Sequence, residues 1–191
     1  MSVADLKIIE GCKKGKRHAQ NKLYDKYAPV LLAICMRYAR NRDEAEDILQ
    51  EGFIKVFSNI GSYRGEGSFE GWLKRIMVNT AITHNKQQLK HHYHTDIDQI
   101  EETHSAADAG RDEGDTVRLA KDKLMNLIQN LPEGYRTVFN MYVFEQYTHR
   151  EIAEIMEISE NTSKSQLSKA RRLLASRIKE ITGNEKITLT E

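Results

Sequence analysis

The stretch Thr148–Leu174, "THREIAEIMEISENTSKSQLSKARRLL", decides the fold of the second half of the chain. Thr148, with Glu151 three residues later, has the pattern of a capping box, which satisfies two backbone donors at the start of a helix. A short apolar face follows, and the segment Glu157–Ser159 predicts a turn. Ser159 can cap a second, longer helix. A short helix, a tight turn and a basic helix together predict a helix-turn-helix, whose second helix can enter the major groove of DNA.

Glu157 stands where a tight turn of this kind favours glycine. If the turn requires a left-handed residue, a residue other than glycine costs roughly 1–2 kcal/mol. A domain is stable by roughly 5–15 kcal/mol, so this cost is bearable. We therefore expect Glu157 to weaken the motif without excluding it.

The second helix of the motif separates into an inner and an outer face. If Leu167, Ala170 and Leu174 are buried, the outer face is basic and rich in short hydrogen-bonding groups, which suits base edges and phosphates. Its members are Asn161, Lys164, Ser165, Ser168, Lys169 and Arg172. A solvated amphipathic helix shows the same pattern, so this face alone leaves both interpretations open.

Apolar residues recur at helical spacing outside the motif as well, and prolines number only two, so we predict an all-α protein. One helix carries an apolar stripe through Leu23 and Leu31, with Pro29 able to kink or break it. A second runs from near Asp43 to about Ile60. After the glycine-containing loop Gly61–Ser68, a third helix begins with Ser68 as its cap.

The sequence has no apolar run of the ~18–20 residues that a membrane helix needs. Its first residues lack the apolar segment of a secretion signal. These two features predict a cytoplasmic protein.

The net charge of +1 hides strong local patterning. Residues 1–42 hold ten basic and three acidic side chains, whereas residues 43–51 hold five acids. Residues 71–94 contain four basic residues and no acid, and residues 162–179 contain six basic residues and no acid. Between them, residues 95–116 hold eight acids and one arginine. Such blocks matter more for partner choice than their sum does.

The acidic block is poor in large apolar residues, so we predict a flexible linker there, with a small helical domain on each side. The predicted division is a first domain over 1–94, a linker over 95–116, a second domain over 117–183 and a tail over 184–191.

Three stretches carry a resemblance to a known family. Residues 131–174, "LPEGYRTVFNMYVFEQYTHREIAEIMEISENTSKSQLSKARRLL", resemble region 4 of bacterial extracytoplasmic-function (ECF) sigma factors of the sigma-70 family. Glu46–Phe57, "EDILQEGFIKVF", is similar to their region 2.2, and Gly67–Lys86, "GSFEGWLKRIMVNTAITHNK", to regions 2.3 and 2.4. The resemblance implies an alternative sigma factor that binds core RNA polymerase and directs transcription initiation at promoters.

The resemblance also assigns residues. Contact with the clamp helices of core polymerase is implied for Asp47, Gln50, Glu51 and Phe53. Asp47, Gln50 and Glu51 share one helix face by spacing and could meet a basic coiled coil. Without the resemblance, the same acids are equally those of a solvated helix start.

Region 2 is implied to read and melt the minus-ten element. The loop Gly61–Ser68 resembles the loop that receives a flipped-out base, a step that costs a few kcal/mol and is recovered by pockets and stacking. Promoter contacts are implied for Trp72, Arg75, Asn79, Thr80, Thr83 and Lys86. By residue type, Phe69 and Trp72 are better explained as core residues than as stacking platforms.

Region 4 is implied to read the minus-thirty-five element. The residues carried over are Thr162, Lys164, Ser165, Ser168, Lys169 and, on the same face, Arg172. Two departures matter. Ser163 replaces a common valine on the inner side, where it should weaken packing or bond a nearby carbonyl. Lysines 164 and 169 replace common arginines and lack the bidentate fork, so base reading should be less sharp.

The resemblance further implies that the linker threads the RNA exit channel. The implied partners are core polymerase (clamp helices and flap), promoter DNA and an anti-sigma factor. It implies no catalytic residues, cofactor or small-molecule substrate. His84 with His91–His94 lacks metal-ligand spacing, so we predict no metal.

Two alternatives stay open. One is a helix-turn-helix regulator that acts without polymerase. The other is an all-α, metal-dependent nucleotide phosphohydrolase, because Glu44, Asp47 and Glu51 fall on one helix face.

Overall fold

Helices supply every regular element in the described part of the chain. The computed structural model describes residues 3–92 and 122–182, and these two ranges contain no strand. The chain divides into two compact units, Met1–His84 and Asn85–Glu191, and the division falls inside helix α4 (Phe69–His92). The predicted all-α class with two small helical domains is confirmed. The predicted linker over 95–116 and tail over 184–191 lie outside the described residues.

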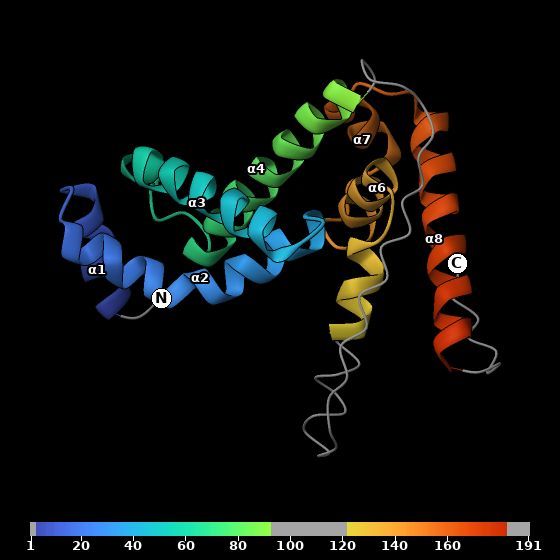
Figure 1. Ribbon diagram of the computed structural model, residues 1–191. Helices are drawn as coiled ribbons and strands as arrows, with labels where there is room; N and C mark the ends of the chain where they lie inside the picture. The colour runs from blue at the N-terminus through green and yellow to red at the C-terminus, as the bar shows by residue number, and fades with distance from the viewer. Residues whose placement is uncertain (1–2, 93–121, 183–191) are drawn as a thin grey trace. The chain divides into compact units, whose positions relative to one another are not determined.

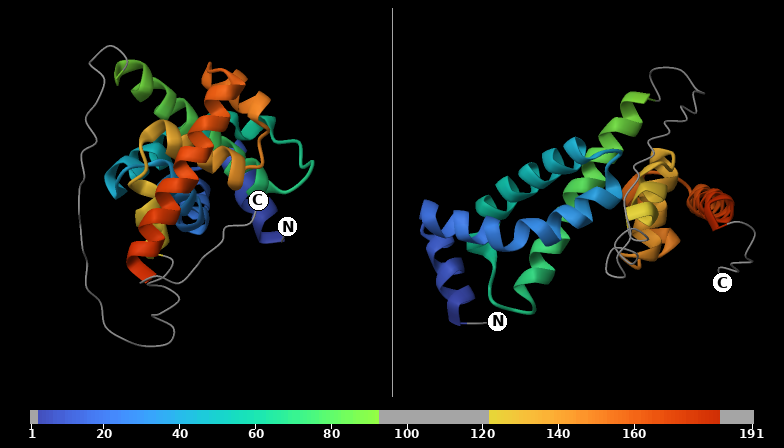
Figure 2. Two further views of the ribbon diagram at one scale, coloured as in Figure 1. Left: turned by 90° about the vertical axis from the view of Figure 1, so that its right-hand side faces the viewer. Right: turned by 60° about the horizontal axis from the view of Figure 1, so that its bottom comes forward.

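The first unit consists of helices that wrap one apolar core (Figure 1). Helices α1 (Val3–Lys13), α2 (Arg17–Tyr38) and α3 (Arg42–Asn59) are followed by the short 3-10 helix η1 (Ile60–Ser62) and by α4. Figure 2 shows α2 and α3 side by side, with α1 against α2. Fully buried side chains of this core include Leu23, Leu31, Ile48, Leu73 and Met77.

Local sequence explains where these helices begin. Asn41 caps α3, since its side-chain oxygen accepts a hydrogen bond from the Glu44 backbone N–H at 2.9 Å. Ser68 does the same for α4 through the Gly71 N–H at 3.3 Å, as the sequence predicts. Helix α2 continues through Pro29, so the proline does not break it. Buried residues on both sides of Pro29 hold the two halves of α2 against the core.

Gly52 sets how closely α3 approaches α4. A Cβ built on Gly52 would lie 2.2 Å from the Met77 sulfur, which is far below a van der Waals contact. This close approach faces inward, where Gly52 is buried and leaves space for the Met77 side chain.

The second unit contains the helix-turn-helix. A helix over 122–129 leads into α6 (Glu133–Val143), which has Pro132 at its N-cap, and α7 (His149–Met156) and α8 (Glu160–Thr182) follow. A buried cluster joins the 122–129 segment and α8 through Ile128, Leu131, Ala170 and Leu174, with Tyr135 and Phe139 of α6 packed on it. The inner face predicted for α8 is therefore confirmed.

The turn between α7 and α8 has the geometry that the sequence predicts. Thr148 and Glu151 form both bonds of the capping box. Glu157 adopts the left-handed conformation (φ 56°, ψ 42°), and the Ile158 N–H closes the helix end on the Ala153 carbonyl at 3.1 Å. Ser159 then caps α8 by accepting from the Thr162 N–H at 3.0 Å.

Within the two described ranges, every helix is either too short or too polar to span a lipid bilayer.

Candidate functional surfaces

Helix α3 presents an acidic outer face. Asp47, Gln50 and Glu51 are all exposed there, as the predicted docking face requires. Glu51 also pairs with Lys55 one turn later at 2.7 Å, an exposed ion pair of small energetic weight. The structure thus brings three of the four predicted polymerase-contacting side chains onto one accessible surface.

Phe53 does not lie on this exposed face, so its predicted contact with polymerase stays a prediction. Its side chain is only 3% exposed. Its ring packs on Tyr24 with centroids 4.6 Å apart and on Phe57 at 5.8 Å. Phe53 points into the domain because it lies six residues after Asp47, which is about 240° around a helix of 3.6 residues per turn.

Ile54 is the apolar residue that the sequence reasoning missed. It is 66% exposed and follows Asp47, Gln50 and Glu51 at the spacing of one helix face. A large apolar side chain inside an exposed acidic face is typical of a contact surface for another protein. The signal was present in the spacing of these residues and needed no structure.

The carboxylates of α3 do not gather around a common point. Glu44 accepts from the Arg40 backbone N–H at 2.5 Å and lies 3.3 Å from His84 Nε2 of α4. Glu51 instead pairs with Lys55. Among the described residues, no three His, Cys, Asp or Glu side chains are grouped as metal ligands. The side chains of His91–His94 lie outside the described residues.

The loop between η1 and α4 is anchored by an aromatic cluster. Gly65 (φ 83°) and Gly67 (φ 74°) take left-handed conformations that favour glycine. Tyr63 donates a hydrogen bond from its hydroxyl to the Gly67 carbonyl at 3.1 Å, which closes the loop. The Tyr63 ring also contacts Phe69 and Trp72 at 5.0 and 5.5 Å. Phe69 is buried and Trp72 half-buried, so these rings serve the core, as expected.

The predicted promoter-contacting residues of α4 differ in how far they are exposed. Arg75, Asn79 and Thr83 are exposed and share one face. The Thr83 hydroxyl donates to the Asn79 carbonyl at 2.8 Å, which leaves its oxygen free to accept. Lys86 is half-buried. Thr80 is only 1% exposed, so it lies off the accessible face. The spacing that aligns Asn79 with Thr83 turns Thr80 toward Met77 and the core.

Helix α8 presents the outer face predicted for base contacts. Its exposed members are Lys164, Ser165, Ser168, Lys169 and Arg172, and Thr162 is half-buried. The Thr162 hydroxyl shares a 2.8 Å hydrogen bond with Ser159, and Ser165 donates to the Thr162 carbonyl at 2.9 Å. The Lys169 ammonium lies 5.8 Å from the centre of the Tyr135 ring. The first turn of α8 is therefore held by its own hydroxyl groups, while the basic side chains remain accessible.

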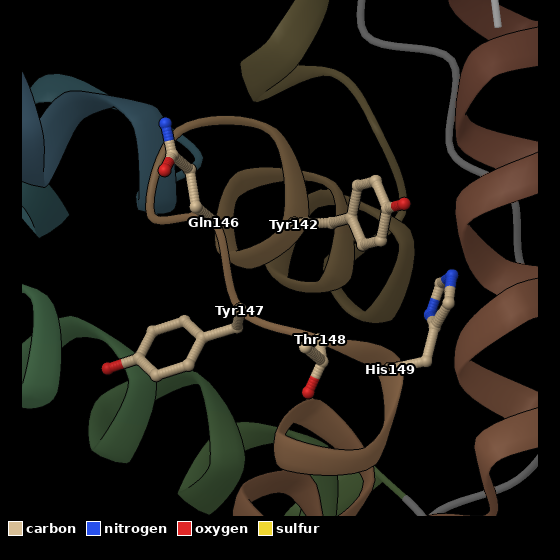
Figure 3. A pocket seen from close by; sticks show the side chains of 5 residues that line it. All are labelled: Tyr142, Gln146, Tyr147, Thr148 and His149. Carbon is tan, nitrogen blue, oxygen red and sulfur yellow. The ribbon is translucent and has the colours of Figure 1, made fainter.

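Ser163 packs inside the motif and makes a bond that the sequence did not predict. Its side chain is fully buried, and its Oγ lies 2.9 Å from His149 Nδ1 rather than bonding a carbonyl. The His149 ring stacks on Tyr142, with centroids 4.7 Å apart. Figure 3 shows these two rings on the side of α6 and α7 nearest α8. Ser163 therefore ties α8 to the start of α7.

Burial lowers the pKa of His149, and the positive charges of Lys164 and Arg171 add to this effect, whereas Glu160 opposes it. The imidazole therefore favours its neutral form, which can exchange one hydrogen bond with Ser163.

A shallow pocket of about 410 Å³ opens beside this contact. Tyr142, Gln146, Tyr147, Thr148 and His149 line it. Their polar ends point in different directions rather than toward a common ligand position (Figure 3). This arrangement lacks the converging polar groups of a small-molecule site.

Comparisons with known proteins match both units. Residues 23–90 match the family "Sigma-70 region 2", and residues 121–174 match "Sigma-70, region 4". The RNA polymerase sigma-H factor of Pseudomonas aeruginosa is 30% identical over 173 residues, which cover 87% of this chain and 90% of that protein. The ECF RNA polymerase sigma-E factor of Haemophilus influenzae is 30% identical over 184 residues, covering 92% and 96% of the two chains.

A solved structure, the sigma factor RpoE in complex with the anti-sigma factor NepR from Bartonella quintana, aligns with a TM-score of 0.44. It is 19% identical and covers 83% of this chain and 96% of that one.

Proposed function

The chain belongs to the sigma-70 family of RNA polymerase sigma factors, in its extracytoplasmic-function group, and from this premise we propose how its surfaces divide the work of promoter recognition. It is an alternative sigma factor that directs transcription initiation, and its partners are core RNA polymerase and promoter DNA. The observation that supports the division is the separation of charge. An acidic and apolar face lies on α3, while the exposed residues predicted to contact DNA on α4 and α8 are basic or uncharged and polar.

The outer face of α3 is proposed to dock on the clamp helices of core polymerase. Asp47, Gln50 and Glu51 supply hydrogen-bond acceptors and negative charge, and Ile54 supplies the apolar centre. Interfaces gain most of their affinity from a few central side chains that lose water on binding. Phe53 supports this surface from within the core.

Loop 61–68 and the exposed face of α4 are proposed to read the minus-ten element. The loop offers left-handed glycines and a closed backbone, which suit the close approach of a flipped base. Arg75 and Asn79 are placed to meet the adjoining DNA, and the helix carries no acid after Glu70 that would repel phosphate. Thr80 contributes packing rather than contact.

Helix α8 is proposed to read the minus-thirty-five element from the major groove. Lys164, Ser165, Ser168, Lys169 and Arg172 supply hydrogen-bond donors and positive charge. The protein is proposed to act in the cytoplasm, to do no chemistry of its own and to be regulated by an anti-sigma factor.

Reconstitution with bacterial core polymerase tests this function. The chain should bind core and produce transcripts from one class of promoter, and failure of both would remove the proposal. A more specific test measures core binding by the double variant Asp47→Ala with Gln50→Ala. This variant should bind core polymerase more weakly while its fold stays intact. The matched control, Asn21→Ala with Asp25→Ala, removes the same kinds of exposed group from α2 and should keep core affinity. Normal core affinity in the Asp47/Gln50 variant would reject the docking face.

A further inference from the structure

A cluster of positive charge lies at the junction of α1 and α2, outside every surface assigned above. We call it the basic turn: the segment Lys13–His18, "KKGKRH", together with Lys22. All six of its basic side chains are exposed: Lys13, Lys14, Lys16, Arg17, His18 and Lys22. No acid occurs between Gly11 and Tyr24.

The basic turn differs from three other lysines of the first unit, whose charges are paired. Lys26, Lys55 and Lys74 each pair with a carboxylate, of Asp5, Glu51 and Glu70 respectively. Within the described ranges, no acid forms an ion pair with Lys14, Lys16, Arg17 or Lys22. These four cations are therefore exposed and unpaired within one short segment of the chain.

The backbone of the turn is fixed. Gly15 takes φ +67°, its N–H donates to the Cys12 carbonyl at 2.9 Å, and the Lys16 N–H donates to the Gly11 carbonyl at 3.0 Å. These two bonds form a Schellman motif at the end of α1. A Cβ on Gly11 would lie 2.5 Å from the Ala19 Cβ, so α1 and α2 are in close contact beside the turn. The cations thus project from a defined scaffold.

Helix electrostatics explains two of the six basic residues. Lys13 and Lys14 lie at the end of α1, where the helix dipole favours cations. Lys16, Arg17 and His18 lie at the start of α2, where the dipole favours anions, and the first turn of α2 has no acid and no side-chain cap. The helix dipole disfavours the charges of Lys16 and Arg17 at this position, so a negatively charged ligand explains them better than helix stability does.

The basic turn adjoins the loop proposed to hold a promoter base. Lys13 donates from its ammonium to the Tyr63 carbonyl at 3.0 Å, and α1 contacts η1. A DNA strand with one base in loop 61–68 must carry its phosphates past this loop. The bond from Lys13 to Tyr63 places the basic turn next to this loop.

We propose that the basic turn binds phosphates that flank the minus-ten base held by loop 61–68, as an additional contact to single-stranded promoter DNA. The proposal rests on the proposed function of that loop. Lysine suits this task because it meets phosphate as a point charge without reading sequence. No large apolar side chain is exposed between Lys13 and Lys22, and a protein partner would need such an anchor.

The test uses the full chain with core polymerase and promoter DNA that is already melted across the minus-ten element. One variant combines Lys14→Gln, Lys16→Gln and Lys22→Gln. A control removes three exposed lysines elsewhere, by Lys7→Gln, Lys123→Gln and Lys179→Gln. Affinity is measured over a series of salt concentrations. The slope of log affinity against log salt should become shallower by about 2 in the first variant, because each single-strand phosphate contact contributes about 0.7.

Neutral methylphosphonates at the phosphates flanking the captured base locate the contact. DNA with these methylphosphonates should bind the wild type more weakly. The lysine-to-glutamine variant, which has already lost the contact, should show little further loss of affinity. An unchanged slope in that variant, or an equal loss in the control, would overturn the proposal. Loss of core affinity without DNA would also overturn it and assign the turn to polymerase. Failure of the proposed function can be told apart from failure of the basic-turn proposal, because the wild type itself would then not bind core or prefer minus-ten DNA.

Discussion

Two neighbouring residues of α3 should separate stability from binding. Phe53 and Ile54 are adjacent in sequence but face different sides of the helix, with exposures of 3% and 66%. Phe53→Ala should lower the free energy of unfolding by about 3–5 kcal/mol, since it empties a buried ring site between Tyr24 and Phe57. This loss is a large fraction of a domain stability of roughly 5–15 kcal/mol. Phe53→Leu keeps most of the volume and should cost less than about 1.5 kcal/mol.

Ile54→Ala should leave the fold nearly unchanged. About a third of the Ile54 side chain is covered, and full burial of isoleucine is worth about 1.5–3 kcal/mol, so the substitution removes less than about 1 kcal/mol. The better helix propensity of alanine offsets part of this loss. Affinity for core polymerase should fall by at least about 1 kcal/mol, which is roughly five-fold, if Ile54 is buried on docking.

Urea unfolding and titration of labelled core polymerase measure the two quantities separately. Phe53→Leu should retain wild-type core affinity, and Ile54→Ala should retain wild-type stability. The reverse pattern, with Phe53→Leu impaired in core binding at normal stability and Ile54→Ala unaffected, would refute the reasoning. It would show that Phe53 leaves the core to reach polymerase.

Three further substitutions probe the fold. Glu157→Gly should raise the free energy of unfolding, measured in thermal or urea unfolding, by about 1 kcal/mol, because glycine adopts the left-handed conformation without strain. Glu157→Ala keeps the Cβ and should not raise it. Gly52→Ala should lower the free energy of unfolding by about 1–3 kcal/mol, because the new Cβ would overlap with the Met77 sulfur. The control Gly71→Ala, whose Cβ would lie 3.6 Å from its nearest neighbour, should be neutral or stabilising. A stabilised Gly52→Ala variant would contradict the close approach of α3 and α4. Because the pKa of His149 is lowered in the folded state, its contribution to stability is complete above the unfolded value near 6.5 and is lost as pH falls through the folded value. His149→Gln should therefore flatten the acid limb of a stability–pH curve, and an unchanged limb would exclude this role.

Sequence reasoning works best where a local rule determines the structure. Helical spacing predicts the buried face of α8, and short polar side chains predict the caps at Ser68, Thr148 and Ser159. The left-handed geometry of Glu157 follows from the turn alone. Each of these features depends on residues within one or two helical turns, so the sequence contains the whole cause.

Features that need a distant partner were not predictable. The role of Gly52 depends on Met77, which lies on another helix. Ser163 could be placed on the inner side, but its partner, His149, depends on how α7 meets α8. The second positive φ outside glycine, at Gln146, has no signal in the sequence that we recognise.

Two predicted contact residues lie away from the exposed faces, and the reason is different. Phe53 and Thr80 were assigned through resemblance to a family, and helical spacing taken by itself places both on inner faces. The same spacing indicates Ile54 as an outer residue of α3. Periodicity is therefore a stricter guide than residue-by-residue transfer when an exposed contact is assigned on a helix.

Separation of charge by face also explains how a chain with a net charge of +1 can serve on DNA. Phosphate binding strengthens with the number of cations that make contact at once. Here the cations are divided among the basic turn, α4 and α8, while the exposed acids of α3 are proposed to meet polymerase. Each basic face alone makes few phosphate contacts, so duplex binding by the free chain should be weak and sensitive to salt. Polymerase, by holding the two units on one promoter, would let all three faces act together, and affinity for DNA then depends on assembly with polymerase.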